Sequence, residues 1–298
     1  MRGKLKKLFA AVLAVLLALS FSGCSELTGL DAQALMSPPK TTADREAIYA
    51  LMGGGVGDVT LVYPKYGDYR SAIISRDLDG CGTSEVVSFC ANGDAGGTRL
   101  EFFKKNTDGV WSSMARFTSA ATQVDKVFFG DLTGDGMDEI IVGWGDPLTA
   151  TASVSVYYVD GDTIREFSMT TVSYSEMLLT DFDSDNIKEL FVLQAAQTSG
   201  EEIMALGGLY RFDGDQPYVS KTVPLDAAVT RYTSVSFSQV NSWRRAAVLD
   251  GVKADGRMLT QVIGYDEASD RLISPLSNEE NATDRPTAAA AVSRDVNK

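Results

Sequence analysis

Residues 131–140 carry the sequence DLTGDGMDEI, and this short acidic stretch decides the fold because it recurs along the chain. Residues 77–86 (DLDGCGTSEV) and 181–190 (DFDSDNIKEL) align with it without gaps, and 239–248 (QVNSWRRAAV) form a degenerate fourth copy. A fifth copy begins at 295 with DVN and reaches the end of the sequence. The five copies start 54, 50, 58 and 56 residues apart. Self-similarity at a nearly constant period predicts a repeat architecture.

Strand-like runs flank each of the four longer copies. Such runs lead into the copies at 71–74, 126–129, 176–179 and 234–238, and others leave them at 85–89, 139–143, 189–193 and 246–249. A second pair of strands should follow in each period, joined by turns at Asp108-Gly109, Asp160-Gly161, Asp213-Gly214 and Asp266-Glu267. In the first three turns, Asp-Gly supplies the positive φ that a tight hairpin needs.

Four strands in a period of roughly fifty residues are typical of the blade of a β-propeller. We therefore predict an all-β chain in which 56–298 form a β-propeller of four-stranded blades, with four full repeats and a C-terminal stub. A β-sandwich is the structural alternative. One short N-terminal helix should occupy 41–55, capped by Thr41 or Thr42 and ended by the glycines at 53–55. Residues 59–63 then favour a strand that pairs with the first blade.

The first 23 residues predict an export signal. Basic residues at 2, 4, 6 and 7 precede an apolar run at 8–21, which is too short to span a membrane. The run ends in Phe21-Ser22-Gly23-Cys24, which resembles the bacterial lipobox. We expect cleavage after Gly23, a lipid on Cys24 and a tether at 24–40, with a plain secretory signal as the alternative. The protein would then lie on the outer face of the cell membrane, attached through its lipid alone.

The composition excludes several kinds of site. The chain of 298 residues contains no His, so His-based general bases, catalytic triads and His-ligated zinc are excluded. A formal net charge of −13 argues against nucleic acid as a partner and favours cations. Cys81 lies in a predicted loop and Cys90 at the far end of the next strand, so we predict that they are unpaired.

The acidic copies predict calcium sites. Oxygen donors at positions 1, 3, 5, 7 and 9 of a tight loop can surround a hard cation, and calcium accepts about six to eight of them. The strongest set contains four carboxylates, and we expect it to bind most tightly: Asp181, Asp183, Asp185 and Glu189, with the carbonyl of Ile187. The second set consists of Asp131, Thr133, Asp135, Glu139 and the carbonyl of Met137.

The other two copies are weaker candidates. The first offers Asp77, Asp79, Glu85 and the carbonyl of Thr83, but Cys81 stands where a carboxylate is needed and a thiol suits calcium poorly. The fourth copy lacks these carboxylates, so we expect it to bind nothing. An EF-hand is excluded because position 12 of each copy falls within a predicted strand. The simpler alternative is that Asp and Gly are only common turn residues.

The pattern D-x-D-x-D-G-x-x-[DE] followed by an apolar residue resembles the FG-GAP (VCBS-type) repeats of integrin α-subunit propellers and bacterial surface proteins. Together with the lipobox, the stretch YPKYGDYRSA at 63–72 and the final SRDVN at 293–297, it makes residues 24–298 similar to FG-GAP lipoproteins of Gram-positive anaerobes. This resemblance implies a propeller, calcium in the matching loops and a surface location.

The sequence favours a non-catalytic binding or scaffold module whose ligand is a protein or a glycan. Most clustered acids belong to the predicted cation loops, and neither a G-x-S-x-G nucleophile motif nor a Gly-rich phosphate loop is present. One alternative is a propeller-type polysaccharide hydrolase or lyase that uses carboxylates. Another is a structural component of the cell envelope.

Overall fold

The computed structural model describes residues 43–55, 57–146, 151–167, 172–199, 202–213, 216–240 and 243–274. The chain divides into two units, Met1–Glu46 and Ala47–Lys298, and every described strand belongs to the second. The expected signal at 1–23, the tether at 24–40 with Cys24, and the motif copy at 295 lie outside the described residues. No helix in the described ranges is long and apolar enough to cross a membrane.

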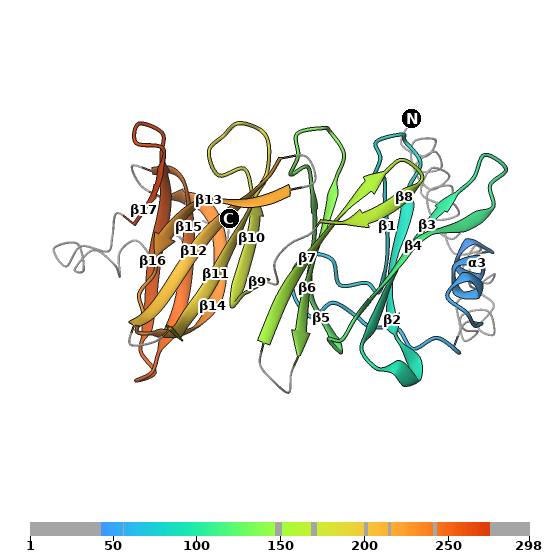
Figure 1. Cartoon of the computed structure of the whole chain (residues 1–298), viewed down its shortest axis with the longest axis horizontal. Helices are drawn as coiled ribbons and strands as arrows, with labels where there is room; N and C mark the ends of the chain where they lie inside the picture. Colours follow the sequence, from blue (N-terminus) through green and yellow to red (C-terminus); the bar gives the residue numbers. More distant parts are fainter. Residues whose placement is uncertain are drawn as a thin grey trace, which may run out of the picture. The chain divides into compact units, whose positions relative to one another are not determined.

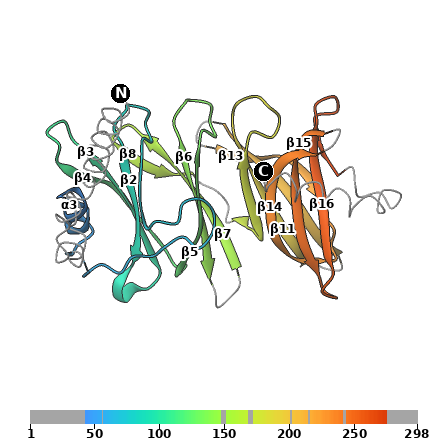
Figure 2. The ribbon, with the colours of Figure 1, turned by 180° about the vertical axis from the view of Figure 1, so that it is seen from behind.

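The strands form four antiparallel sheets, which follow one another in chain order in both views (Figures 1 and 2). Sheet 1 contains β1 (Ile73–Arg76), β2 (Glu85–Ala91), β3 (Thr98–Lys105) and β4 (Trp111–Ser119), with a short 3-10 helix, η3 (Gly93–Ala95), after β2. Sheet 2 contains β5 (Gln123–Gly130), β6 (Glu139–Asp146), β7 (Thr151–Asp160), β8 (Thr163–Glu166) and β9 (Val172–Ser173). Sheet 3 contains β10 (Glu176–Thr180), β11 (Glu189–Ser199), β12 (Glu202–Asp213) and β13 (Gln216–Pro224). Sheet 4 contains β14 (Val229–Val240), β15 (Trp243–Lys253), β16 (Met258–Asp266) and β17 (Arg271–Ile273).

Each sheet is a meander, because strands that are neighbours in sequence are also neighbours in the sheet. In sheet 2 the extra strand β9 pairs with β7. The predicted turns at 108–109, 160–161 and 266–267 join the third and fourth strands of their sheets, and Gly109 and Gly161 have φ of +78° and +60°. Gly214, in the remaining predicted turn, lies outside the described residues. The prediction of four strands per repeat is therefore confirmed for all four repeats.

Apolar clusters join each sheet to the next. Phe89 and Phe102 of sheet 1 pack with Trp144 of sheet 2, and corresponding clusters join sheet 2 to sheet 3 and sheet 3 to sheet 4. In β6, Ile140 contacts the sheet 1 side while Ile141 contacts the sheet 3 side, as expected where side chains alternate between faces. Both faces of β6 are therefore buried, and its residues 140–142 form a continuous apolar run.

The helix α3 (Ala43–Leu51) confirms the predicted N-terminal helix. Ile48, Tyr49 and Met52 pack in a cluster with Val86, Cys90 and Phe103, on the face of sheet 1 that points away from sheet 2. Cys90 is buried while Cys81 is exposed, and both are free thiols, in agreement with the prediction that they are unpaired.

The segment at 59–63 is not a full strand. Leu61 forms an isolated antiparallel bridge with Cys90. The Ala91 N–H donates to the carbonyl of Thr60 at 2.8 Å, and the Val62 N–H donates to the carbonyl of Phe89 at 3.0 Å. The expected pairing with the first sheet is thus present, but it is short.

A closed ring is not seen among the described residues. None of their apolar clusters joins sheet 1 to sheet 4, and every described sheet pairing lies within one repeat. The structure shows an all-β chain of four antiparallel sheets with one short helix. A stack of this kind is compatible with a β-sandwich-like arrangement as well as with an open arc of blades.

Phe89→Ala should lower the free energy of unfolding by about 3–5 kcal/mol, because it leaves a cavity between sheets 1 and 2. Phe89 is fully buried, and its ring meets that of Trp144 edge to face at 6.3 Å between centroids. Tyr218→Ala is the matched control, since Tyr218 is 48% exposed on β13. Urea unfolding measures both variants, and equal losses of stability would contradict the stacking of these two sheets.

Candidate functional site

The first three acidic copies form loops of one shape, each between the first and second strands of its sheet. The residue before each loop pairs with the glutamate that ends it, as Gly130 does with Glu139. Positions 4 and 6 of every loop have left-handed backbone: Gly80 and Gly82, Gly134 and Gly136, Ser184 and Asn186, with φ between +67° and +86°. The third loop therefore adopts at two non-glycine residues a conformation that glycine adopts without strain.

A buried glutamate closes each loop. Its carboxylate accepts a hydrogen bond from the backbone N–H of position 2, at 2.9 Å for Glu85, 2.7 Å for Glu139 and 2.8 Å for Glu189. These glutamates are only 1–3% exposed. Burial raises the pKa of Glu139 and of Glu189 to about 7, and neighbouring carboxylates add to the increase. The pKa of Glu85 is raised for the same reasons.

The aspartate at position 1 organises the rest of each loop. Its carboxylate accepts the N–H of position 6, at 2.9 Å in the Asp77 and Asp131 loops and 3.3 Å in the Asp181 loop. Further N–H groups bond to the carboxylates of Asp79, Asp135 and Asp185. The loop backbone alone therefore compensates part of the negative charge.

Each loop also holds one buried side-chain oxygen that has no hydrogen-bond partner among the described residues. These atoms are Asp77 Oδ1, Thr133 Oγ1 and Asp183 Oδ1. A buried polar atom without a partner costs roughly 1–3 kcal/mol, so each loop lacks one favourable contact. All three atoms belong to residues that the sequence predicts as calcium ligands, and a hard cation would satisfy them. The donor set therefore fits calcium, and it would lie among these oxygens.

The side-chain atoms of the predicted ligands lie close together in the first and third loops but not in the second. Oxygens of Asp181, Asp183 and Glu189 lie within 4.8 Å of one another, as do ligand atoms of Asp77, Asp79 and Cys81. No such group forms among the described residues of the second loop, where Asp135 is exposed. Three predicted donors act through backbone carbonyls: Thr83 is exposed, Met137 packs on the core between sheets 1 and 2, and Ile187 lies against Gly134.

Arg211 occupies the third loop, and the sequence pattern gives no sign of it. From β12, its guanidinium forms an ion pair with Asp183, contacts Glu189 at 2.7 Å and reaches Asp185 at 3.5 Å. Arg245 lies 3.8 Å from Asp181. Counting carboxylates alone ranks the third loop first for calcium, but this arginine offers the same carboxylates a competing positive charge.

Neighbouring loops are bonded to one another through their backbones. The Asp138 N–H of the second loop donates to the carbonyl of Leu78 at 3.2 Å, and the Lys188 N–H of the third loop donates to the carbonyl of Asp131 at 2.9 Å. Arg76 reinforces the first link through an ion pair with Asp138. The three loops therefore form one continuous chain of contacts.

The degenerate fourth copy, 239–248, does not form this loop. Gln239 and Val240 lie within β14, and Val240 pairs with Trp243 of β15. Ser238 pairs with Ala246, whereas the residue before each acidic loop pairs one position later, with the closing glutamate. Without acidic side chains to hold a wide loop, the two strands pair as far as Val240 and Trp243.

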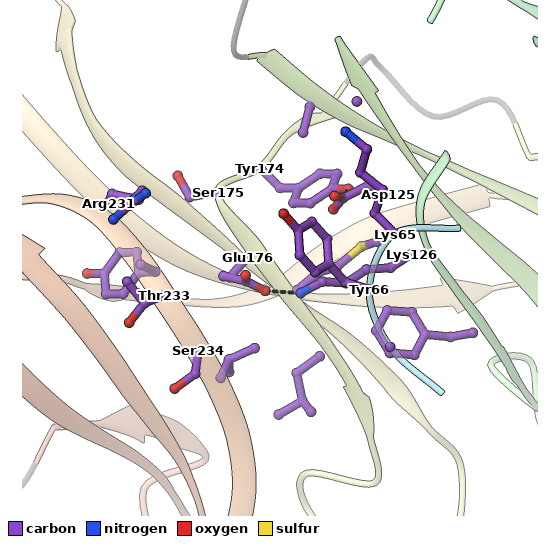
Figure 3. Close-up of a pocket in the computed structure, with 18 of the residues that line it drawn as sticks. Lys65, Tyr66, Asp125, Lys126, Tyr174, Ser175, Glu176, Arg231, Thr233 and Ser234 are labelled. Carbon is purple, nitrogen blue, oxygen red and sulfur yellow. Dashed lines mark hydrogen bonds and ion pairs between the residues drawn. The ribbon is translucent and has the colours of Figure 1, made fainter. Parts of the chain in front are cut away.

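A pocket of about 950 Å³ lies at the other ends of the first strands (Figure 3). It is bordered by the beginnings of β5, β10 and β14 and by the segment 65–68, and we call it the first-strand pocket. The acidic loops begin where β5 and β10 end, so the two features occupy opposite ends of these strands.

Comparisons with known proteins give little guidance. No family model matches the sequence, and no curated protein matches it. Among solved structures, a rhamnogalacturonan lyase, PL11, from Bacillus licheniformis is similar over 75% of this chain and 53% of its own, with 14% identity and a TM-score of 0.38. The chain thus spans about half the length of that lyase. A likeness this low carries no argument about the fold or the activity.

Glu139→Gln should remove one contribution to the pH dependence of stability when calcium is chelated. Glu139 has its usual pKa near 4.5 when unfolded and about 7 when folded. The folded state therefore binds the proton more tightly, and the stability that this provides is present below pH 4.5 and lost as the pH rises through 7. Urea unfolding at pH 5 and pH 8 should show a smaller change for Glu139→Gln than for wild type, and equal changes would contradict the assignment.

Arg211→Gln should increase the effect of calcium on stability, because it removes the competing charge from Asp183 and Glu189. The calcium-induced rise in melting temperature should be larger in this variant than in wild type. Arg257→Gln is the matched control, since Arg257 is exposed and pairs with Asp255 in a distant turn. An unchanged calcium response in Arg211→Gln would show that the arginine does not compete for the site.

Proposed function

We propose that this chain is a surface-anchored β-propeller module that calcium stabilises and that binds a ligand without catalysis. The observation that carries the proposal is the set of three acidic loops with one backbone shape, each with a buried glutamate and a buried oxygen that has no partner in the described part of the chain. Turn chemistry alone explains neither the burial of the glutamates nor the unpaired oxygens.

The arrangement of the first strands supports the propeller. In a propeller, the blades are radial repeats around a central channel, and consecutive blades pack face to face. Here β5, β10 and β14 border one pocket, and consecutive sheets pack through apolar clusters. Four such sheets would form an arc of blades. The resemblance to FG-GAP repeats supports the same architecture.

Calcium would act as a structural element. It would be held by carboxylates from the loop that joins the two inner strands of a blade, and it would offset their mutual repulsion. Because the loops bond to one another, an ion in one loop would also stabilise its neighbours. Extracellular calcium sites bind at about 10⁻⁴–10⁻³ M, so a surface protein would keep them filled.

The membrane attachment in this proposal rests on the sequence. Small residues before Cys24 and the apolar run that precedes them support a lipid on this cysteine. Labelling with a fatty-acid probe should mark the wild type and leave Cys24→Ala unmarked.

The state of the pocket carboxylates supports binding over catalysis. Asp125 accepts a hydrogen bond from the Tyr174 hydroxyl at 2.7 Å, and Glu176 forms an ion pair with Lys126. A glycosidase needs two carboxyl groups that are free to reach the scissile bond from either side. Both Asp125 and Glu176 are instead engaged by neighbouring protein side chains.

Calcium should raise the melting temperature of the purified residues 24–298, since it binds the folded loops better than the unfolded chain. At free calcium 100 times its Kd, one site contributes about 2.7 kcal/mol. Asp181→Ala with Asp183→Ala should reduce the rise. Asp94→Ala with Asp108→Ala, two exposed acids outside the loops, should leave it unchanged. Identical melting curves with calcium and with chelator would overturn the calcium part of the proposal.

The non-catalytic part is tested by measuring turnover on a panel of polysaccharides beside a glycan and protein binding array. Binding without product formation supports a binding module. Sustained product release that is lost when a carboxylate outside the acidic loops is changed would instead make the protein an enzyme.

A further inference from the structure

Several polar residues that line the first-strand pocket are held in place by hydrogen bonds to neighbouring strands. The backbone of 65–66 is anchored to the start of β5, where the Lys65 N–H donates to the carbonyl of Val124 at 3.1 Å and the Tyr66 N–H donates to that of Asp125 at 2.9 Å. The Lys65 ammonium also bonds to the side chain of Gln123. These contacts fix the backbone of Tyr66 at the pocket before any ligand arrives, which lowers the entropy cost of binding.

Two side-chain contacts link residues that line the pocket, and the second of them joins sheet 2 to sheet 3. The Tyr174 hydroxyl donates to Asp125, and Lys126 pairs with Glu176. Figure 3 shows Arg231 on one side of the pocket, Lys65 and Tyr66 on the other, and Glu176 between them. Polar side chains from three segments far apart in sequence therefore converge on one space.

The charges of the lining residues compensate one another. Three are basic (Lys65, Lys126 and Arg231) and three are acidic (Asp68, Asp125 and Glu176). An ionic ligand would gain little from a site without net charge, and it would meet like charges on arrival. A ligand whose groups both donate and accept hydrogen bonds can use both signs at once. Hydroxyl groups have this property.

Two side chains are free to meet such a ligand. Arg231 is exposed, and its guanidinium forms no side-chain hydrogen bond or ion pair with any described residue, so its planar group of donors is available. Tyr66 is 54% exposed, and its ring offers an apolar face with a polar tip. An aromatic face beside convergent polar groups matches a sugar ring, which has apolar C–H faces and a rim of hydroxyl groups.

Resting on the proposed binding function, we propose that the first-strand pocket binds a neutral oligosaccharide. Tyr66 packs against a sugar ring, and Arg231 and Lys65 donate to hydroxyl oxygens from opposite sides. Asp125, Asp68 and Gln123 provide the acceptors. The pocket volume of about 950 Å³ lies near the upper end for small-molecule sites and accommodates a short oligomer.

The test is calorimetric titration of the calcium-loaded protein with neutral oligomers of glucose, mannose, galactose and xylose, and with oligomers of galacturonic acid. We expect at least one neutral oligomer to bind, and Tyr66→Ala and Arg231→Gln each to weaken it about tenfold or more. Tyr218→Ala and Arg257→Gln are the matched controls, because each alters the same residue type at an exposed position outside the pocket. Both controls should bind like wild type.

Each other outcome overturns a defined part of the inference. Tighter binding of galacturonate oligomers would contradict the neutral class. Binding that survives both pocket variants would place the sugar site elsewhere. If no saccharide binds while calcium still raises the melting temperature, the inference fails and the proposed binding function remains, with a protein as its ligand. Release of shorter oligomers would overturn the non-catalytic function itself.

Discussion

The hydrogen bond from the second residue of each acidic loop to the glutamate that ends it is the contact on which the rest of the structure depends. A charged acceptor makes such a bond worth about 1.5–3 kcal/mol. It ties the exit of the first strand to the entry of the second, and thereby sets the register in which those two strands pair. That register decides which side chains face the preceding sheet and which face the next one.

The same contact has a cost, because the carboxylate that accepts the bond is removed from water. Burial, together with the acids around them, raises the pKa of Glu139 and Glu189 to about 7. The second and third loops differ in the positive charge that lies beside this carboxylate. In the third, Arg211 brings a guanidinium from β12 to Glu189, whereas in the second no described arginine contacts Glu139.

The periodic part of the structure was predictable from the sequence, while the contacts between repeats were not. The spacing of the acidic copies located the first two strands of three repeats, because Asp and Gly at fixed positions dictate the loop between them. Arg211 lies 22 residues after Glu189 and on a different strand, so no local pattern pairs them. Lys126 of β5 and Glu176 of β10 likewise meet only because sheets 2 and 3 stack. The fourth copy keeps the apolar positions of the pattern without its acids, and apolar positions alone also fit a plain hairpin.

The hydrogen bonds between neighbouring loops give two amide groups an unusual role. The amide hydrogens of Asp138 and Lys188 are bonded to carbonyls of the loop in the preceding sheet. Their exchange with solvent deuterium therefore reports on the opening of a loop to which they do not themselves belong. Two residues can in this way serve as probes of whether adjacent repeats open separately or as one cooperative unit.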